Sequence, residues 1–348
     1  MILQRLFLLF AITAGVTHAH AGEVEFAPIS WAGVSSTKSA VYGHAIEHEG
    51  RRYLYYSGGI QGGSGKSSSI FLRVGSKTTD GWIYGGPKQI LTPTPRSPDQ
   101  LMIDRPCVVE GRFKTQGANG TSTFNFLMCY HGLDAYPPNG SWRVFFAVSD
   151  SVTGPWKKVG QLFLNDREFD GKVSTMSMSM DAKNSDVRLF YCFEGTPCTQ
   201  LVNIAHLESP VAYRRIPIPL DGLTTGSGAD EVRFLFPKFC VDGDSLLTIR
   251  SLTEDPSLDL VYVTNAGDVS KIPLTGVITG KPHRWETMQR FSCPDDFPAN
   301  MFGFCGFVCD TRGHLLKGED GSYEVLVTVQ DSVDDIQSRK IHTLKIKP

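Results

Sequence analysis

The sequence predicts an all-β protein with a five-bladed β-propeller architecture, and two observations support this prediction. Helical periodicity is nearly absent, and the apolar stretches are short, rich in β-branched and aromatic residues, and interrupted by Gly, Pro, Asn and Asp. These stretches also recur as a weak repeat along the chain. Sequential repetition of one unit favours small sheets arranged radially. A two-sheet sandwich, which also has many short strands, is the alternative.

The repeat divides the chain into five units, each centred on one strong aromatic or aliphatic strand. These strands start near residues 53, 124, 187, 245 and 323. Each unit opens with a shorter strand and a polar turn, such as the turns at 49–50, 110–111 and 242–244. In a propeller such units surround a central channel, and loops at the channel mouth build a site. Residues 22–348 are therefore expected to form a single five-bladed domain.

The first 21 residues have the anatomy of a secretory signal peptide. Arg5 precedes a short apolar run over residues 6–14, and Ala19-His20-Ala21 is a small-x-small cleavage site. The apolar run is too short to cross about 30 Å of hydrocarbon, and no later run is long enough. We therefore expect residues 1–21 to be removed and the mature protein to be secreted or periplasmic, without a membrane attachment.

Charge and motifs exclude several functional classes. A net charge of −2 provides no basic field for a nucleic-acid backbone, so nucleic acid is not an expected partner. The Gly-rich stretch at 58–66 lacks the spacing of a phosphate-binding loop. No Cys-x-x-Cys pair occurs, which argues against structural zinc. The sequence thus predicts no metal site and no cofactor, and we expect a monomer.

Eight cysteines in a chain expected to be exported permit disulfides. Connectivity does not follow from sequence, and some of these residues are alternatively small buried hydrophobes. Three pairs are candidates, because their members are close in sequence or fall on strands expected to be adjacent: Cys192 with Cys198, Cys305 with Cys309, and Cys107 with Cys129.

Three segments resemble the five-bladed glycosidases of the arabinanase, xylosidase and fructosidase kind (glycoside hydrolase family 43 and its relatives). Residues 146–156, FAVSDSVTGPW, resemble the A-x-S-x-s-x-x-G-P-W outer-strand turn of that group. Residues 103–109, IDRPCVV, are similar to its blade-opening strands, and 50–56 to its G-x-Y-Y-L second strand. The order of elements matches over nearly the whole chain. The resemblance implies a carbohydrate partner, and it leaves open a channel Ca²⁺ for which the sequence has no motif.

The resemblance also implies a set of carboxylates that project into the channel. Breaking a glycosidic bond requires protonation of the leaving oxygen on one side and attack from the other, so two carboxyls must face each other across the sugar. The second-unit position of this set falls on Asp104. The first-unit position falls on Tyr42, beside Gly43 and His44, and the third unit opens with the run 176–180, MSMSM. Neither of these positions holds a carboxylate.

The expected catalytic residues are therefore Asp104, with Glu194 and Glu231 as candidate partner carboxyls. Asp104 has the position implied by the resemblance, and Arg105 beside it is suited to clamp a carboxylate or a sugar hydroxyl. Glu194 directly follows a strong strand, and Glu231 precedes the fourth unit. The alternatives are a structural Asp104–Arg105 pair and solvated loop glutamates.

The expected substrate-binding residues are Tyr42, His44, Arg105 and His131. His44 lies at the opening of the first unit and His131 follows the strong strand of the second. Histidine acts as an acid or base near neutral pH and also donates to hydroxyls.

Two functions from different classes follow. The first is a secreted glycoside hydrolase that acts on a poly- or oligosaccharide, with a histidine in place of a carboxylate as a variant of it. The alternative is a non-catalytic propeller that binds glycans or a protein and lacks the full carboxylate set.

Overall fold

The computed structural model consists of β-strands joined by turns and irregular segments. It describes residues 24–28, 30–31, 39–59, 68–135, 142–161, 173–180, 187–193, 196–202, 207, 216–217, 235–242, 245–251, 257–264, 284–292, 301–330 and 339–346. No helix of this part of the chain is long and apolar enough to span a membrane. The predicted signal peptide, Glu194 and Glu231 lie outside the described residues.

The strands form three four-stranded antiparallel sheets and one ten-stranded sheet. The second unit contains β8 (Met102–Gly117), β9 (Gly120–Leu133), β10 (Trp142–Ser149) and β11 (Lys157–Gln161). The third contains β12 (Val173–Met180), β13 (Val187–Phe193), β14 (Thr196–Val202) and β15 (Ile216–Pro217). The fourth contains β16 (Leu235–Asp242), β17 (Ser245–Ser251), β18 (Ser257–Thr264) and β19 (Arg284–Ser292).

The ten-stranded sheet consists of the first and fifth units, joined by one short parallel pair between β20 and β3. The first unit contains β3 (Ala40–His48), β4 (Arg51–Gly58), β5 (Ser69–Thr78), β6 (Gly81–Tyr84) and β7 (Lys88–Leu91), with β2 (Ser30–Trp31) beside β6. The fifth contains β20 (Met301–Cys309), β21 (Tyr323–Gln330), β22 (Lys340–Ile346) and β1 (Val24–Pro28). Each predicted strong strand coincides with the second strand of its unit, namely β4, β9, β13, β17 or β21.

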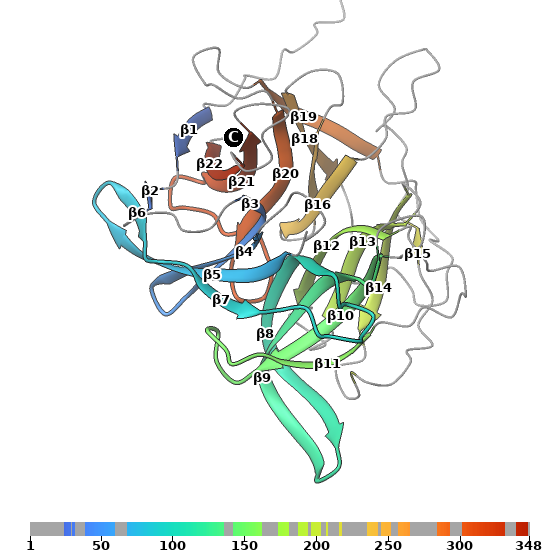
Figure 1. Cartoon of the computed structure of the whole chain (residues 1–348). Helices are drawn as coiled ribbons and strands as arrows, with labels where there is room; N and C mark the ends of the chain where they lie inside the picture. Colours follow the sequence, from blue (N-terminus) through green and yellow to red (C-terminus); the bar gives the residue numbers. More distant parts are fainter. Residues whose placement is uncertain are drawn as a thin grey trace, which may run out of the picture.

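The first strands of the five units, β3, β8, β12, β16 and β20, contact one another in cyclic order and close a ring. They lie near the centre of the molecule, and the later strands of each unit lie outside them (Figure 1). The prediction of an all-β propeller is therefore confirmed. This grouping agrees with five blades, although the blade number itself stays a prediction.

Each first strand breaks register with its partner near its N-terminal end. The breaks fall between Val41 and His44, Asp104 and Cys107, Ser174 and Met176, Leu235 and Lys238, and Gly303 and Gly306. A bulge at such a position bends the strand and redirects its side chains. We call this end of the ring, where all five first strands begin, the mouth.

The opposite end of the ring is crossed by residues 310–316, which we call the closing segment. Its carbonyls accept hydrogen bonds from the amides of Glu110 on β8 at 2.7 Å and Met180 on β12 at 2.8 Å. The Leu315 amide donates to Val241 on β16 at 2.8 Å. One loop of the fifth unit thus ties three other units together at this end of the ring.

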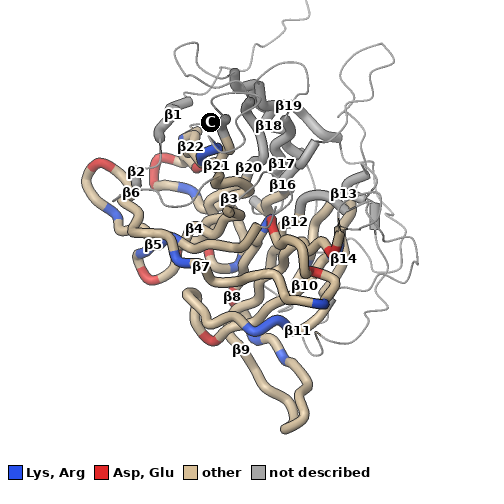
Figure 2. The backbone as a smooth tube through the Cα atoms, in the orientation of Figure 1, with Lys and Arg blue, Asp and Glu red and all other residues tan. Residues whose placement is uncertain are grey.

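The first and last units are held together by strand pairing and by an ion pair. β20 of the fifth unit pairs with β3 of the first, and β1, which precedes the first unit in the chain, pairs with β22 of the fifth. The buried Arg52 guanidinium donates to Glu47 on β3 and to Glu324 on β21, each at 2.6 Å, and lies over the Trp82 ring. Lys and Arg residues alternate with Asp and Glu residues along the described backbone (Figure 2).

Candidate active site

The mouth side of the first two units contains a compact cluster of buried polar side chains. Tyr42 and Arg105 occupy the bulges of β3 and β8 with positive φ angles of 57° and 53°. Positive φ is uncommon for non-glycine residues and is found often at functional sites. The Arg105 amide donates to Ser57 Oγ at 2.9 Å, which anchors the bulge of β8 to β4.

Arg105 is the centre of this cluster, although its side chain is only 5% exposed. Its two terminal nitrogens contact His131 Nδ1 at 2.8 Å and the Tyr42 hydroxyl at 3.0 Å. The guanidinium also lies 4.5 Å from the centre of the Tyr42 ring and 5.4 Å from that of Trp142. These contacts hold a planar cation in one orientation beside Asp104, as a guanidinium stacks well on aromatic faces.

Asp104 and His131 are paired across β8 and β9, and both are buried. Asp104 Oδ1 lies 3.7 Å from His131 Nδ1. Because a guanidinium only donates, a hydrogen bond from Arg105 requires His131 Nδ1 to act as the acceptor. Asp104 is therefore the carboxylate of the cluster, and His131 acts as a support behind Arg105.

Burial raises the pKa of Tyr42, against the opposing effect of the Arg105 charge. Burial by itself would lower the pKa of Arg105, but Tyr42 and Asp104 outweigh it and the pKa is raised. The tyrosine is thus a neutral hydroxyl and the arginine a fixed cation at physiological pH.

His44 lies apart from this cluster, on the wall of the channel. Its Nε2–H donates to the Val108 carbonyl at 3.2 Å, and Nε2 lies 3.8 Å from Cys107 Sγ. A narrow cavity follows the channel here, with wall residues from every first strand, including Gly43, Cys107, Ser177, Phe239 and Gly306. Among the residues that the structure describes, no three His, Cys, Asp or Glu side chains are arranged to hold a metal ion.

Four of the predicted site residues, Tyr42, Asp104, Arg105 and His131, are thus brought together. Sequence reasoning missed Ser57 as a partner of Arg105. It also missed Arg339, which lies close enough to Tyr42 to oppose the rise of that residue's pKa. No motif marks either residue, because both approach the cluster through strand pairing or backbone contacts to β3.

The structure shows none of the three candidate disulfides, because Cys107, Cys129, Cys198 and Cys309 form no disulfide bond in it. Cys107 and Cys129 are opposite each other as expected, but the Cys107 sulfur accepts from the Met178 amide at 3.1 Å instead. Cys198 is registered with Tyr191, not with Cys192. Cys305 and Cys309 belong to the same strand, and a rise of about 3.3 Å per residue keeps them too far apart to bond.

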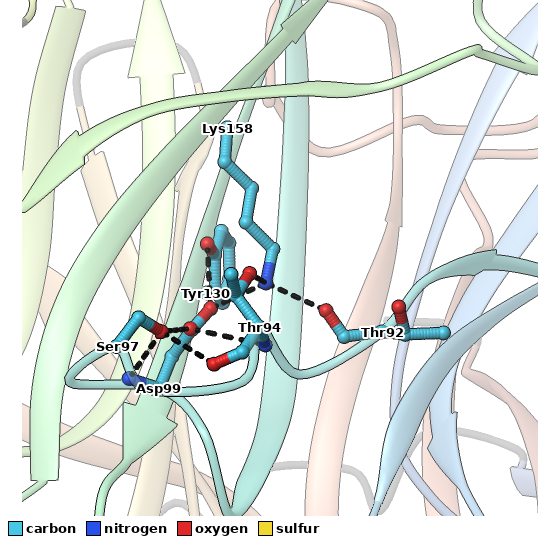
Figure 3. A network of polar contacts seen from close by, with 6 residues as sticks. All are labelled: Thr92, Thr94, Ser97, Asp99, Tyr130 and Lys158. Atoms are coloured by element: carbon cyan, nitrogen blue, oxygen red, sulfur yellow. Dashed lines mark hydrogen bonds and ion pairs between the residues drawn. The ribbon is translucent and has the colours of Figure 1, made fainter.

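A second buried polar group, Asp99, belongs to the segment between β7 and β8 and has a structural role (Figure 3). Lys158 Nζ lies 2.5 Å from its carboxylate and also donates to Thr92 and Thr94. The Tyr130 hydroxyl donates to Asp99 at 3.2 Å. These groups satisfy one another, so the network fixes the connection between two units and leaves no group free for a ligand.

Buried tyrosines predict the alkaline limit of stability. Burial raises the pKa of Tyr42, Tyr55 and Tyr130, and it raises that of Tyr84 to about 12 from an ordinary 10.0. A pKa that is higher in the folded state means that the folded protein binds more protons above pH 10, so stability falls as the pH rises from about 10 towards 12. We expect the ultraviolet band of phenolate from these residues to appear together with loss of the β-sheet circular dichroism signal. Full ionisation with an unchanged circular dichroism spectrum would contradict this expectation.

Comparisons with known proteins agree with this architecture. No family model and no curated protein sequence matches the chain. Solved structures do match over nearly the whole chain. A family 117 glycoside hydrolase of the marine bacterium Zobellia galactanivorans has a TM-score of 0.61 at 10% identity, covering 94% of this chain and 91% of that one. The catalytic domain of a Coprinopsis cinerea GH62 α-L-arabinofuranosidase has a TM-score of 0.59 at 9% identity, covering 94% and 97%.

A family 43 glycoside hydrolase of Xanthomonas citri, solved with xylotriose, has a TM-score of 0.59 at 13% identity, covering 91% of this chain and 89% of that one. These neighbours are propeller glycosidases, so the predicted resemblance is confirmed at the level of the fold. At such low identities the likeness concerns the fold alone.

Proposed function

We propose that the chain is a secreted glycoside hydrolase that acts on a poly- or oligosaccharide at the mouth of the propeller channel. The observation that carries the proposal is Asp104, a carboxylate 4% exposed at the bulge of β8, flanked by the fixed cation Arg105. A carboxylate held in this way at a channel mouth is suited to act on a bound sugar ring, by binding it or by taking part in proton transfer.

Hydrolysis needs a second carboxyl across the sugar, and Glu194 and Glu231 are the proposed partners. Glu194 directly follows β13, whose last residue Phe193 is paired with Val173 at the start of β12. Glu231 precedes β16, which starts at Leu235. Glu194 therefore adjoins a strand end at the mouth in the chain, and Glu231 precedes another by four positions.

One observation favours the second candidate, a propeller that binds a carbohydrate without cleaving it. Of the five bulges at the mouth, only that of β8 contains an acidic residue in the described strands. The equivalent bulge of β3 presents Tyr42, and β12 has the sequence VSTMSMSM. Under this alternative Tyr42, Trp142 and Arg105 form a binding surface, and Asp104 accepts a hydrogen bond from a sugar hydroxyl.

Release of reducing ends from a panel of polysaccharides and aryl glycosides tests the proposal. The panel should include xylo-oligosaccharides and arabinose-containing polymers, since the neighbours are a family 43 enzyme solved with xylotriose and an arabinofuranosidase. We expect the mature chain, starting at Gly22, to release sugar from at least one substrate. A folded protein that binds glycans saturably but releases no sugar would instead establish the binding function.

A further inference from the structure

Two cysteines on neighbouring units lie in contact inside the ring, away from the mouth. Cys240 is on β16 and Cys309 is the last residue of β20, and their sulfurs are 3.6 Å apart. Both side chains are buried, at 2% and 4% exposure, in the same hydrophobic cluster. The strands β16 and β20 are adjacent in the ring (Figure 1).

The backbone holds the two sulfurs together. Residue 315 of the closing segment pairs with Cys309 and donates its amide to the carbonyl of Val241, the residue after Cys240. His314 is in turn bridged to Val241. The two strand ends are therefore tied to each other by one short segment, so the sulfurs can approach each other through small side-chain rotations.

Three other buried cysteines lie in a different hydrophobic cluster. Cys107, Cys129 and Cys198 belong to a separate hydrophobic cluster between the second and third units. The Cys107 sulfur accepts from the Met178 amide and lies beside His44. The contact between their sulfurs marks Cys240 and Cys309 as a candidate pair.

We propose that Cys240 and Cys309 form a disulfide that cross-links the fourth and fifth units when the protein folds in an oxidising compartment. The oxidant is a disulfide, R–S–S–R. One cysteine thiolate attacks it to give a mixed disulfide and releases one R–SH, and the second cysteine then displaces another R–SH. The pair loses two electrons and two protons, and the oxidant gains them.

The chemical environment of the pair indicates when the bond forms. The hydrogen bond with Cys240, together with burial, raises the pKa of the Cys309 thiol well above its ordinary value. A thiol that is rarely ionised reacts slowly. We therefore expect the bond to form during folding, before the cluster closes, and to react slowly with oxidants or reductants in the folded protein.

Oxidative refolding tests the proposal without reference to any activity. The mature chain is refolded with reduced and oxidised glutathione, the remaining thiols are alkylated, and its peptides are mapped by mass spectrometry without reduction. We expect a linked peptide that joins residues 240 and 309. This bond closes a loop of 69 residues. Protein that is reduced while unfolded and then refolded without the bond should therefore have a Tm roughly 5 to 10 °C below that of the oxidised protein.

Three variants make the test specific. Cys240→Ser and Cys309→Ser should each abolish the linked peptide and the dependence of the Tm on reductant. Cys107→Ser is the matched control, since it also removes a buried thiol near the channel, and it should retain both. Alkylation of both cysteines after oxidative refolding, pairing of either one with another cysteine, or a wild-type Tm that is unchanged after reduction in the unfolded state would overturn the proposal.

Discussion

Asp104→Asn is expected to lower the rate of sugar release by about 100-fold to 10,000-fold on any substrate that the wild-type chain cleaves. The substitution keeps the size of the side chain and removes the carboxylate. Because Arg105 remains in place through His131 and Tyr42, the cluster should stay assembled. The loss should therefore fall mainly on kcat, which is the pattern expected when a group acts in the transition state.

The control for this prediction is Asp150→Asn, which removes an exposed carboxylate next to the end of β10 and should leave the rate unchanged. Circular dichroism and the Tm establish that both variants are folded. A folded Asp104→Asn variant with a rate within threefold of the wild type would remove Asp104 from the reaction. A variant in which only KM rises would assign Asp104 to substrate binding.

Gly306→Ala is expected to reduce the free energy of unfolding by about 3 kcal/mol or more. Gly306 lies on the channel wall where β20 and β3 approach each other, and a Cβ there would overlap the carbonyl oxygen of Gly43. A backbone carbonyl cannot rotate out of the way of a new Cβ as the end of a flexible side chain can. The substitution must therefore separate the two strands that join the fifth unit to the first.

Urea denaturation measures this effect, with Gly86→Ala as the control. Gly86 is exposed, and a Cβ there would meet no atom within 4 Å. The control should change the free energy of unfolding by less than about 0.5 kcal/mol. A loss below about 1 kcal/mol for Gly306→Ala would mean that the closure of the ring does not depend on this close approach.

Much of the fold could be predicted because the strong strand of each unit is continuous in sequence. The residues around 53, 124, 187, 245 and 323 are apolar and β-branched or aromatic, and such runs mark buried strands without tertiary information. The pairing of β1 with β22 has no such local signal. It depends on the closure of the ring, which brings the two ends of the chain together.

Four residues of the buried cluster, Tyr42, Asp104, Arg105 and His131, could be named from the sequence, but their roles could not. Asp104 and Arg105 stand in a recognisable strand opening, whereas the positive φ of Arg105 arises from a bulge that sequence does not reveal. His131 was expected beyond the end of its strand. β9 continues to Leu133, however, so His131 is buried opposite Asp104 and supports Arg105.

The cysteines show why local spacing misleads in a radial fold. Cys305 and Cys309 are close in sequence but lie along one strand, where close positions are extended away from each other. Cys240 and Cys309 are 69 positions apart and in contact, because their strands are neighbours in the ring. Contacts between units follow the cyclic order of the units and not the distance along the chain.

The separation between the Asp104 carboxyl and the nearest other carboxyl at the mouth tests the central claim most directly. A crystal structure of the protein that includes the carboxyl groups of Glu194 and Glu231 would provide it. Hydrolysis of a glycosidic bond predicts a second carboxyl, from Glu194 or Glu231, about 5 to 10 Å from Asp104 across the channel mouth. A mouth in which Asp104 has no carboxyl facing it at that distance would contradict the hydrolase and favour carbohydrate binding alone.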